Sequence, residues 1–287
     1  MLLHTEDPLK FAFSTTDPER IPELSFGILG VPFDSTTTYV PGARFGPLAV
    51  REASYSFESY NLRFSGEPGV KCFDFGDVDV VPGNFQRTAE FIGDSIRGVL
   101  DLGLKPITLG GEHTVTLPVV EELTCHGKAP VVIHLDAHMD MADRYAGERY
   151  SHATVMRRVH ELGAEVIQIG VRSASADEAE FVGENGIRCI MAHEVMKNPG
   201  VVSEALRDIR DPVYISVDID VLDPAYAPAV GNPTPCGLTP WVLEDIAELL
   251  SRKDVIGFDV VEVASTGFGD QTSVNAAKII YDLLTLL

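Results

Sequence analysis

Carboxylate and imidazole side chains recur at every second position in two short segments. The first segment carries Asp136, His138 and Asp140, and the second carries Asp218 and Asp220 at the end of an apolar run. In an extended chain, residues two apart point to the same side, so each segment would present its donors together. One such pair is often only a helix cap or a turn, but two clusters at strand ends predict a metal site.

His113, just after the Gly110-Gly111 pair, supplies a sixth donor. The four aspartates carry four negative charges, which would repel each other without a cation between them. Two divalent ions would neutralise that charge, and six donors exceed the needs of one tetrahedral zinc ion. An oxygen-rich set with only two histidines favours manganese over zinc. We therefore predict a pair of Mn²⁺ ions, between which a water would ionise near neutral pH and become a hydroxide nucleophile.

A parallel sheet would bring these donors to one place. Short apolar, β-branched runs predict strands over residues 26–31, 106–109, 131–136, 165–171, 213–217 and 255–263. Stretches of mixed polar and apolar spacing predict helices over residues 46–60, 86–102, 154–162, 177–185, 201–209, 241–251 and 273–286. This alternating order implies a parallel sheet with helices on both faces. Such sheets hold their ligand sites at the carboxyl ends of the strands.

Length and composition limit the fold and the partners. With 287 residues, 45% of them hydrophobic, and no linker or repeat, we expect one domain over residues 1–287. Asp and Glu total 43 against 22 Lys and Arg, and the formal net charge of -21 repels nucleic acids and anionic membranes. Four widely spaced cysteines indicate a reducing compartment, and no apolar run reaches the roughly 18 residues of a membrane span. We therefore expect a soluble, cytoplasmic protein with a small cationic partner.

The motifs as a set resemble the ureohydrolase (arginase/agmatinase) family. The resemblance covers nearly the whole chain and is carried by residues 32–36 (PFDST), 41–47 (PGARFGP), 110–113 (GGEH), 136–140 (DAHMD), 216–224 (SVDIDVLDP) and 257–263 (GFDVVEV). It implies a three-layer α/β/α sandwich around a mostly parallel sheet, assembled as a homo-oligomer of three or six subunits. It also implies a two-manganese centre that hydrolyses a guanidino compound to urea.

The family pattern divides the six donors between two Mn²⁺ ions. The resemblance implies that one ion is held by His113, Asp136, Asp140 and Asp218, and the other by Asp136, His138, Asp218 and Asp220. Two of the aspartates, at positions 136 and 218, would therefore bridge the ions. His134 lies deeper in the same predicted strand and is expected to support a ligand rather than to bind metal.

Three residues receive catalytic roles from the resemblance. Glu262, at the end of the predicted strand 255–263, would pair with the planar guanidinium of the substrate. Asp140 would accept the hydroxide proton, and His152 would help to pass it to the departing amine. Taken alone, Glu262 would be a surface or capping acid, and His152 a helix N-terminal residue beside the cap Ser151.

Residues 141–152 resemble the agmatinase branch of the family. They lack the Asn- and Ser/Thr-containing loop with which arginases recognise the amino-acid end of arginine. Agmatine has no carboxylate, and Asp143 or Glu148 would face its distal ammonium, so we expect conversion of agmatine to putrescine and urea. Arginine, guanidinobutyrate and other guanidino acids are alternative substrates, because Arg144 or Arg149 would suit a carboxylate. A non-catalytic member of the fold is a further alternative, against which the full donor set argues.

Two stretches depart from the family pattern. Residues 233–237 (PTPCG) stand where many relatives have PEPGG, and residues 263–267 (VASTG) replace a run that usually contains proline and tyrosine. Neither change replaces a proposed metal ligand, so both bear on specificity. Arg44, in the segment 42–47, is expected to order its loop by pairing with an acid.

Overall fold

The computed structural model describes residues 5–6, 9–265 and 267–287. Its described strands form one ten-stranded sheet in the order β1-β4-β3-β5-β10-β9-β6-β7-β8, with β2 paired to β4 outside this path. Every pair is parallel apart from β1 with β4, so the predicted mostly parallel sheet is confirmed. The strands are β1 (Thr5–Glu6), β2 (Ser14–Thr15), β3 (Phe26–Gly30), β4 (Cys72–Val78), β5 (Lys105–Leu109), β6 (Val131–Leu135), β7 (Val166–Val171), β8 (Arg188–Met191), β9 (Val213–Asp218) and β10 (Val255–Val261).

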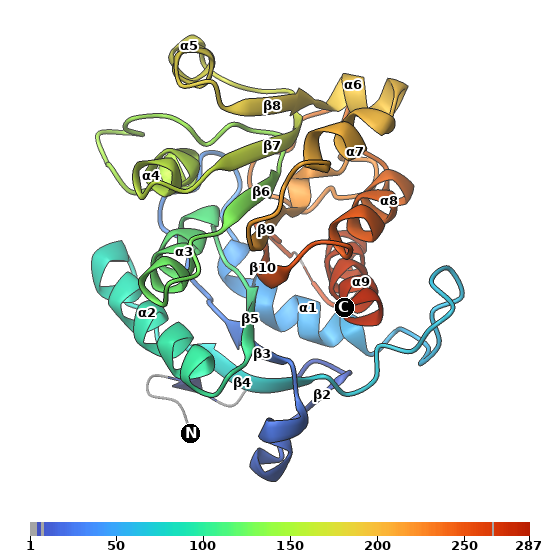
Figure 1. Ribbon diagram of the computed structural model, residues 1–287. Helices are drawn as coiled ribbons and strands as arrows, with labels where there is room; N and C mark the ends of the chain where they lie inside the picture. Colours follow the sequence, from blue (N-terminus) through green and yellow to red (C-terminus); the bar gives the residue numbers. More distant parts are fainter. Residues whose placement is uncertain (1–4, 7–8, 266) are drawn as a thin grey trace.

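Helices cover both faces of the sheet, which confirms the predicted three-layer α/β/α sandwich (Figure 1). Helices α2, α3 and α4 lie on one face, and α1, α8 and α9 lie on the other. The α-helices are α1 (Gly46–Ser54), α2 (Phe85–Asp101), α3 (Thr116–Cys125), α4 (Val155–Glu161), α5 (Ala176–Glu184), α6 (Ala192–Lys197), α7 (Gly200–Leu206), α8 (Pro240–Leu250) and α9 (Gln271–Leu286). The 3₁₀ helices are η1 (Pro18–Glu23), η2 (Ala43–Phe45), η3 (His113–Val115), η4 (His152–Thr154) and η5 (Ile219–Val221).

Burial of apolar surface explains this arrangement. The strands β6, β7, β9 and β10 are buried along their whole length, as expected for strands covered by helices on both sides. In α2, Thr88, Ile92, Ile96 and Val99 are buried at spacings of three and four residues, so one stripe of the helix faces the protein interior. β4 alternates buried and partly exposed residues, because it lies close to the edge of the sheet.

The structure corrects several of the predicted elements. The elements β4, β8, α3 and α6 lie outside the predicted strands and helices. The predicted helix 46–60 ends at Ser54, whose hydroxyl donates to the carbonyl of Arg51 at 2.6 Å. The predicted strand 255–263 ends at Val261, because Glu262 adopts a left-handed φ of 63° that an extended strand cannot contain.

The strand order brings four polar strand ends to one edge of the sheet. The strands β5, β10, β9 and β6 are neighbours and run parallel, so their carboxyl ends meet. His113 follows β5, Asp136 follows β6, Asp218 ends β9 and Glu262 follows β10. The topology therefore joins residues that lie far apart in the sequence, at the edge where parallel sheets hold their ligands.

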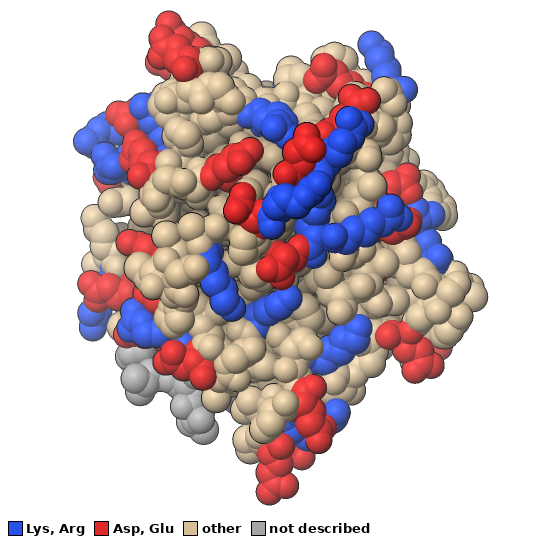
Figure 2. All heavy atoms as spheres, in the orientation of Figure 1, with Lys and Arg blue, Asp and Glu red and all other residues tan. Residues whose placement is uncertain are grey.

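Side chains of both charges occupy one face of the molecule (Figure 2). On the face in Figure 2, Lys and Arg side chains gather toward the centre and mix with Asp and Glu side chains. Lys105, which begins β5, donates to the carbonyl of Val255 at 2.6 Å, and so lies at the amino ends of the strands rather than beside the donors. None of the helices in the described ranges is both long and apolar enough to cross a membrane.

Candidate metal centre

Acidic side chains surround His113 at the carboxyl ends of β6 and β9. His113 Nδ1 lies 3.1 Å from Asp136 Oδ2 and 3.1 Å from Asp140 Oδ2. It lies 3.4 Å from Asp218 Oδ2. All four side chains are buried, so water does little to screen the repulsion among the three carboxylates.

A second group of donors shares Asp136 with the first. His138 Nδ1 lies 3.3 Å from Asp136 Oδ1 and 3.1 Å from Asp220 Oδ2. Potential ligand atoms of these three residues lie within 4.8 Å of one another, and so do those of a second set, His113, His134, Asp136 and Asp140. The structure thus brings the six predicted donors into two adjoining groups that meet at Asp136.

The hydrogen bonds behind His113 place the single proton of its neutral ring on Nε2. Ser216 donates its hydroxyl to Asp259 Oδ1 at 2.8 Å, so the Ser216 oxygen is free only to accept from His113 Nε2, 2.9 Å away. With the proton on Nε2, the buried Nδ1 keeps its lone pair, and it has no hydrogen-bond partner. Burial would lower the pKa of His113, but the three carboxylates raise it well above its usual value, so in the metal-free protein a proton occupies this position. The lone pair that this proton covers, facing three carboxylates, fits a metal ion.

Crowding of acids displaces the pKa values within the cluster. Burial, and next the charge of Asp136, raise the pKa of Asp140 to about 6. Burial, and next the charge of Asp220, raise the pKa of Asp218 well above its usual value. Burial would lower the pKa of His138, but Asp220 and Asp136 raise it to about 12. Acids that resist ionisation and a histidine that retains its proton are the expected response of such a cluster when no cation compensates it.

The donors converge by turns and not along the extended path that the sequence predicts. β6 ends at Leu135, and Asp140 adopts a left-handed φ of 54°. β9 ends at Asp218, whose carboxylate caps the 3₁₀ helix η5 by accepting from the N–H of Asp220 at 2.8 Å. Two amides at the start of α4 donate to the Asp140 carbonyl at 3.1 and 3.2 Å, and so hold this strained residue in place.

Glu262 reaches the same centre from β10. It is buried, and its Oε1 accepts from the backbone N–H of His113 at 2.7 Å. Burial, and next the charge of Glu112, raise the pKa of Glu262 well above its usual value. Glu262 lines a cavity of about 350 Å³ together with four of the donors, His138, Asp140, Asp218 and Asp220. The cavity therefore opens directly onto the carboxylate cluster.

His152 lines the same cavity from the 3₁₀ helix η4. Its Nδ1 lies 3.0 Å from Thr36 Oγ1, and its Nε2 lies 2.8 Å from Thr38 Oγ1. Burial, and next the positive charges of His138 and His113, lower the pKa of His152 to about 4. The preceding Ser151 forms a capping box, so His152 both follows a helix cap and forms part of the cavity wall.

The sequence did not single out all the neighbours of His138. Asn232 Nδ2 and Thr234 Oγ1 lie 3.1 and 3.2 Å from His138 Nε2. Thr234 belongs to the first stretch that departs from the family pattern, so this departure contacts a proposed ligand; position 266 of the second stretch lies outside the described residues. His134 Nε2 lies 2.8 Å from Asp136 Oδ2, which suits a residue that orients this carboxylate.

The acid on the outer wall of the cavity is Glu178, and not a residue of the 141–152 segment. Asp143 forms an ion pair with Arg158 at 3.2 Å, and neither Asp143 nor Glu148 lines the cavity, so the prediction that one of them faces the substrate is wrong. Glu178 does line it. Its Oε1 accepts from the N–H of Met141 at 3.0 Å, which fixes the acid beside the carboxylate cluster.

Two arginines order the loops around the centre. Arg44 pairs with Asp34, as the sequence predicts. The Arg172 guanidinium donates to the carbonyl of Asp220 at 2.6 Å and to that of Thr234 at 2.8 Å. It therefore joins the turn that carries a proposed ligand to the loop that contacts His138.

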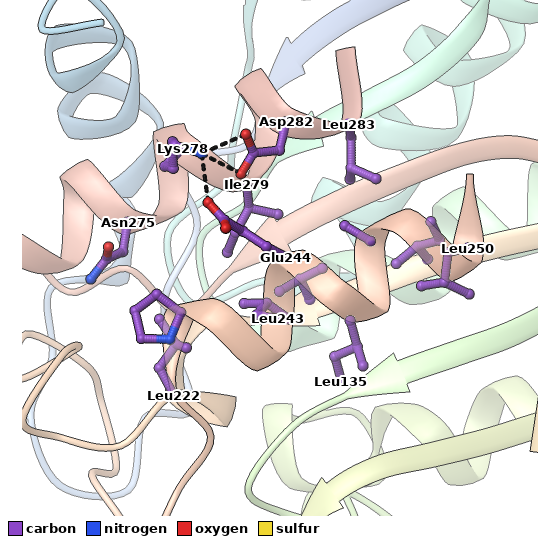
Figure 3. Close-up of a pocket in the computed structure, with 14 residues that line it drawn as sticks. Leu135, Leu222, Leu243, Glu244, Leu250, Asn275, Lys278, Ile279, Asp282 and Leu283 are labelled. Atoms are coloured by element: carbon purple, nitrogen blue, oxygen red, sulfur yellow. Dashed lines mark hydrogen bonds and ion pairs between the residues drawn. The ribbon is translucent and has the colours of Figure 1, made fainter. Parts of the chain in front are cut away.

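Other hollows lie away from the donors. One of about 730 Å³ lies among α2, α3 and residues 149–162. Another, of about 30 Å³, lies between α8, α9 and the sheet, where Lys278 bonds Glu244 and Asp282 (Figure 3). The smaller has room for about one or two waters. Neither is lined by any of the six donors, so the cavity at the strand ends is the candidate active site.

Comparison with known proteins identifies the family. The sequence model of the arginase family matches residues 24–285. The chain belongs to the arginase family. This arginase-family chain is 39% identical to an agmatinase of Pyrococcus horikoshii over 98% of its own length and 97% of the relative's. It is 38% identical to an N(1)-aminopropylagmatine ureohydrolase of Thermococcus kodakarensis, over 97% of its own length and 95% of the relative's.

A solved structure shares the fold of this arginase-family chain. The agmatine ureohydrolase of Thermoplasma volcanium superposes with a TM-score of 0.86 at 33% identity. The match covers 97% of this chain and 94% of the solved one. The resemblance that the sequence motifs carry is therefore confirmed at the level of family and fold.

Proposed function

We propose that this protein hydrolyses agmatine, with one water, to putrescine and urea. The observation that carries the proposal is a cavity lined at once by a carboxylate cluster and by Glu262, a buried acid suited to a guanidinium. The agmatinase and agmatine ureohydrolase relatives support the same chemistry.

We further propose that the cluster holds two Mn²⁺ ions. His113, Asp136, Asp140 and Asp218 would hold one, and Asp136, His138, Asp218 and Asp220 the other. Three oxygens facing Nδ1 of His113, and the sharing of Asp136 between the two donor groups, support this division. When bound, the ions neutralise the acids and supply an ionised water as the nucleophile near neutral pH.

Glu262 is proposed to hold the guanidinium. Its Oε1 is fixed by the His113 N–H, so the side chain is already oriented before the substrate arrives. A planar guanidinium offers parallel N–H groups that a carboxylate accepts in pairs. Substrate bound to Glu262 would present its central carbon to the donor cluster on the wall of the same cavity.

Asp140 and His152 are proposed to move the protons. Asp140 lines the cavity within the donor cluster, where it would accept the proton of the attacking hydroxide. The departing amine needs that proton. His152 lines the same cavity and would pass it on, because a neutral imidazole can accept at one nitrogen while it is held at the other.

The tail of the substrate is proposed to be cationic. Away from the donors the cavity wall carries Glu178, and Arg144 is the opposing charge. The arginase-family relative named for N(1)-aminopropylagmatine makes a longer cationic tail a second candidate, which Glu178 would also favour. A carboxylate-bearing substrate, arginine or guanidinobutyrate, would meet that acid unfavourably.

A substrate panel tests the proposal. On Mn²⁺-loaded protein, we expect urea and amine release from agmatine with kcat/KM at least about tenfold above arginine, which corresponds to about 1.4 kcal/mol of transition-state discrimination. N(1)-aminopropylagmatine and guanidinobutyrate complete the panel. Equal or better activity on arginine or guanidinobutyrate would refute the agmatinase proposal, and absence of urea from every substrate would favour a non-catalytic member of the fold.

Assembly and location follow as further proposals. We propose a homo-oligomer of three or six subunits, which sedimentation equilibrium would measure. A cytoplasmic location is supported by four cysteines that remain free thiols, Cys72, Cys125, Cys189 and Cys236.

A further inference from the structure

A buried acid beside the donor cluster is held by four hydrogen bonds. Glu112 is fully buried and belongs to neither proposed ligand set. Its Oε2 accepts from the backbone N–H groups of Ser35 at 2.5 Å and Thr36 at 2.7 Å. Its Oε1 accepts from the hydroxyls of Thr36 at 2.9 Å and Thr114 at 2.6 Å. Four donors fill the acceptor sites of a carboxylate, so Glu112 only accepts.

The hydroxyl of Thr36 therefore has a fixed direction. It has one hydrogen, and that hydrogen goes to Glu112. Toward His152 the Thr36 oxygen can only accept, and it does so from the backbone N–H at 3.1 Å. The ring Nδ1 of His152 lies 3.0 Å from the same oxygen. A hydrogen bond between these two atoms requires the proton to be on Nδ1.

The other ring nitrogen is then left to accept. In a neutral imidazole with its proton on Nδ1, Nε2 has a free lone pair. Thr38 Oγ1 lies 2.8 Å from Nε2 and would donate to it until a substrate group takes its place. Both Thr38 and His152 line the cavity. The nitrogen that is free to exchange a proton is therefore the one beside Thr38.

We propose that Glu112 and Thr36 are positioning residues that hold neutral His152 in its Nδ1–H tautomer and so make Nε2 the proton-exchanging atom. This inference rests on the proposed role of His152 in ureohydrolysis. The opposite tautomer would carry its proton on Nε2 and could not accept one there, so a loss of this control would lower the rate of proton transfer and not the affinity for substrate.

A glycine permits this arrangement. An added Cβ on Gly111 would lie 1.9 Å from the carbonyl oxygen of Phe33, so only glycine allows the 33–36 loop to approach the end of β5. The N–H of Glu112 donates to that same Phe33 carbonyl at 2.8 Å. The close approach therefore sets Ser35 and Thr36 over the Glu112 carboxylate.

Two substitutions of Thr36 and one of Glu112 test the proposal. Thr36→Val removes the acceptor of Nδ1–H, whereas Thr36→Ser retains it. Glu112→Gln should direct its amide oxygen to the two backbone N–H groups and its NH₂ to Thr36. The Thr36 hydroxyl would then donate to Nδ1 and drive the ring proton to Nε2. Thr124→Val is the matched control, since that hydroxyl lies in α3 and donates to the carbonyl of Val120 at 2.8 Å.

The tautomer can be read without any activity. We would label the histidines with ¹⁵N, replace paramagnetic Mn²⁺ by diamagnetic Zn²⁺, and record long-range ¹H–¹⁵N spectra, with His152→Ala to assign the signal. We expect protonated Nδ1 and bare Nε2 in the wild type and Thr36→Ser. We expect loss of that preference in Thr36→Val, and its reversal in Glu112→Gln.

Kinetics on Mn²⁺-loaded protein provide the second measurement. Thr36→Val should lower kcat about tenfold or more, leave KM within about threefold and keep its metal, while Thr36→Ser recovers most of the rate. A wild-type spectrum with the proton on Nε2 would overturn the proposal. So would a Thr36→Val protein that loses kcat with an unchanged tautomer. If the wild type released no urea, the proposed function would fail, and the spectra alone would decide the tautomer.

Discussion

Replacement of Glu262 by glutamine would test the proposed guanidinium site with little change of shape. Glutamine keeps an oxygen that can accept from the His113 N–H, now 2.7 Å from Oε1, and loses only the negative charge. Neutralising one partner of a buried, hydrogen-bonded ion pair costs about 2–5 kcal/mol, because little solvent replaces it. Glu262 is only 7% exposed, so screening is weak and the lower end of that range does not apply.

That cost converts into a measurable loss of specificity constant. At about 1.4 kcal/mol per factor of ten, a loss of 3–4 kcal/mol lowers kcat/KM for agmatine by about 10²–10³. Urea release at fixed pH on Mn²⁺-loaded protein is the assay, with metal content and thermal midpoint recorded for each variant. Glu148→Gln is the matched control, because it removes an exposed carboxylate that does not line the cavity.

Two outcomes would contradict the proposed role of Glu262. A Glu262→Gln protein with full metal content and kcat/KM within about threefold of the wild type would remove Glu262 from substrate binding. An equal loss in Glu148→Gln would trace the effect to the overall field rather than to a local ion pair.

Three further outcomes are expected. Asp136→Asn and Asp218→Asn should nearly abolish turnover while the fold stays intact. Each should also hold less Mn²⁺ than His113→Ala does. Full metal occupancy by elemental analysis, together with normal urea release, would contradict the two-metal proposal. His152→Ala should retain its metals and lose about 10²–10⁴ in kcat, whereas loss of metal would make His152 structural. The pKa of His152 is lowered to about 4, below its unfolded value, so its contribution to stability is full above pH 6.5 and falls as the pH decreases toward 4. The free energy of unfolding of metal-free protein can be measured by urea denaturation at pH 7 and at pH 5. Between these two pH values His152→Asn should lose about 1–2 kcal/mol less of this free energy than the wild type. Equal losses would contradict the lowered pKa of His152.

Sequence alone predicted the donors better than their geometry. Period-two spacing grouped Asp136 with Asp140, and the expected parallel sheet brought Asp218 to the same edge. The structure places the oxygens of all three 3.1–3.4 Å from His113 Nδ1. The assumed extended path is wrong, because Asp140 has a φ of 54° and Asp218 caps a 3₁₀ helix. Spacing predicts which side chains can share a side, but tertiary hydrogen bonds decide which turn brings them together.

The strand β4 shows how buried polar groups hide an element from a local pattern. β4 was missed because its sequence, CFDFGDV, interrupts the apolar pattern with two aspartates. The structure satisfies both through Arg51, which is fully buried and bonds Asp74 at 2.9 Å and Asp77 at 2.5 Å. A partner 23 to 26 residues away in the chain is invisible to a local pattern. The link from Thr36 to His152, which spans 116 residues, escaped for the same reason.

One part of the site is fixed by the sheet, and the other part is built from loops. Substitutions in the two parts should therefore affect substrate specificity differently. The donors and Glu262 sit at the ends of four adjacent parallel strands, where a shift of any one would disturb the others. The outer wall is made by residues in loops or at a helix start, such as Thr38, Tyr145, Glu178 and Asn232. Glu178 meets the donor loop through a backbone N–H, that of Met141, whereas Asn232 lies 3.1 Å from the ring of His138, at Nε2. A substitution there would alter the substrate tail and a proposed ligand together, so specificity should vary more freely at Glu178 than at Asn232.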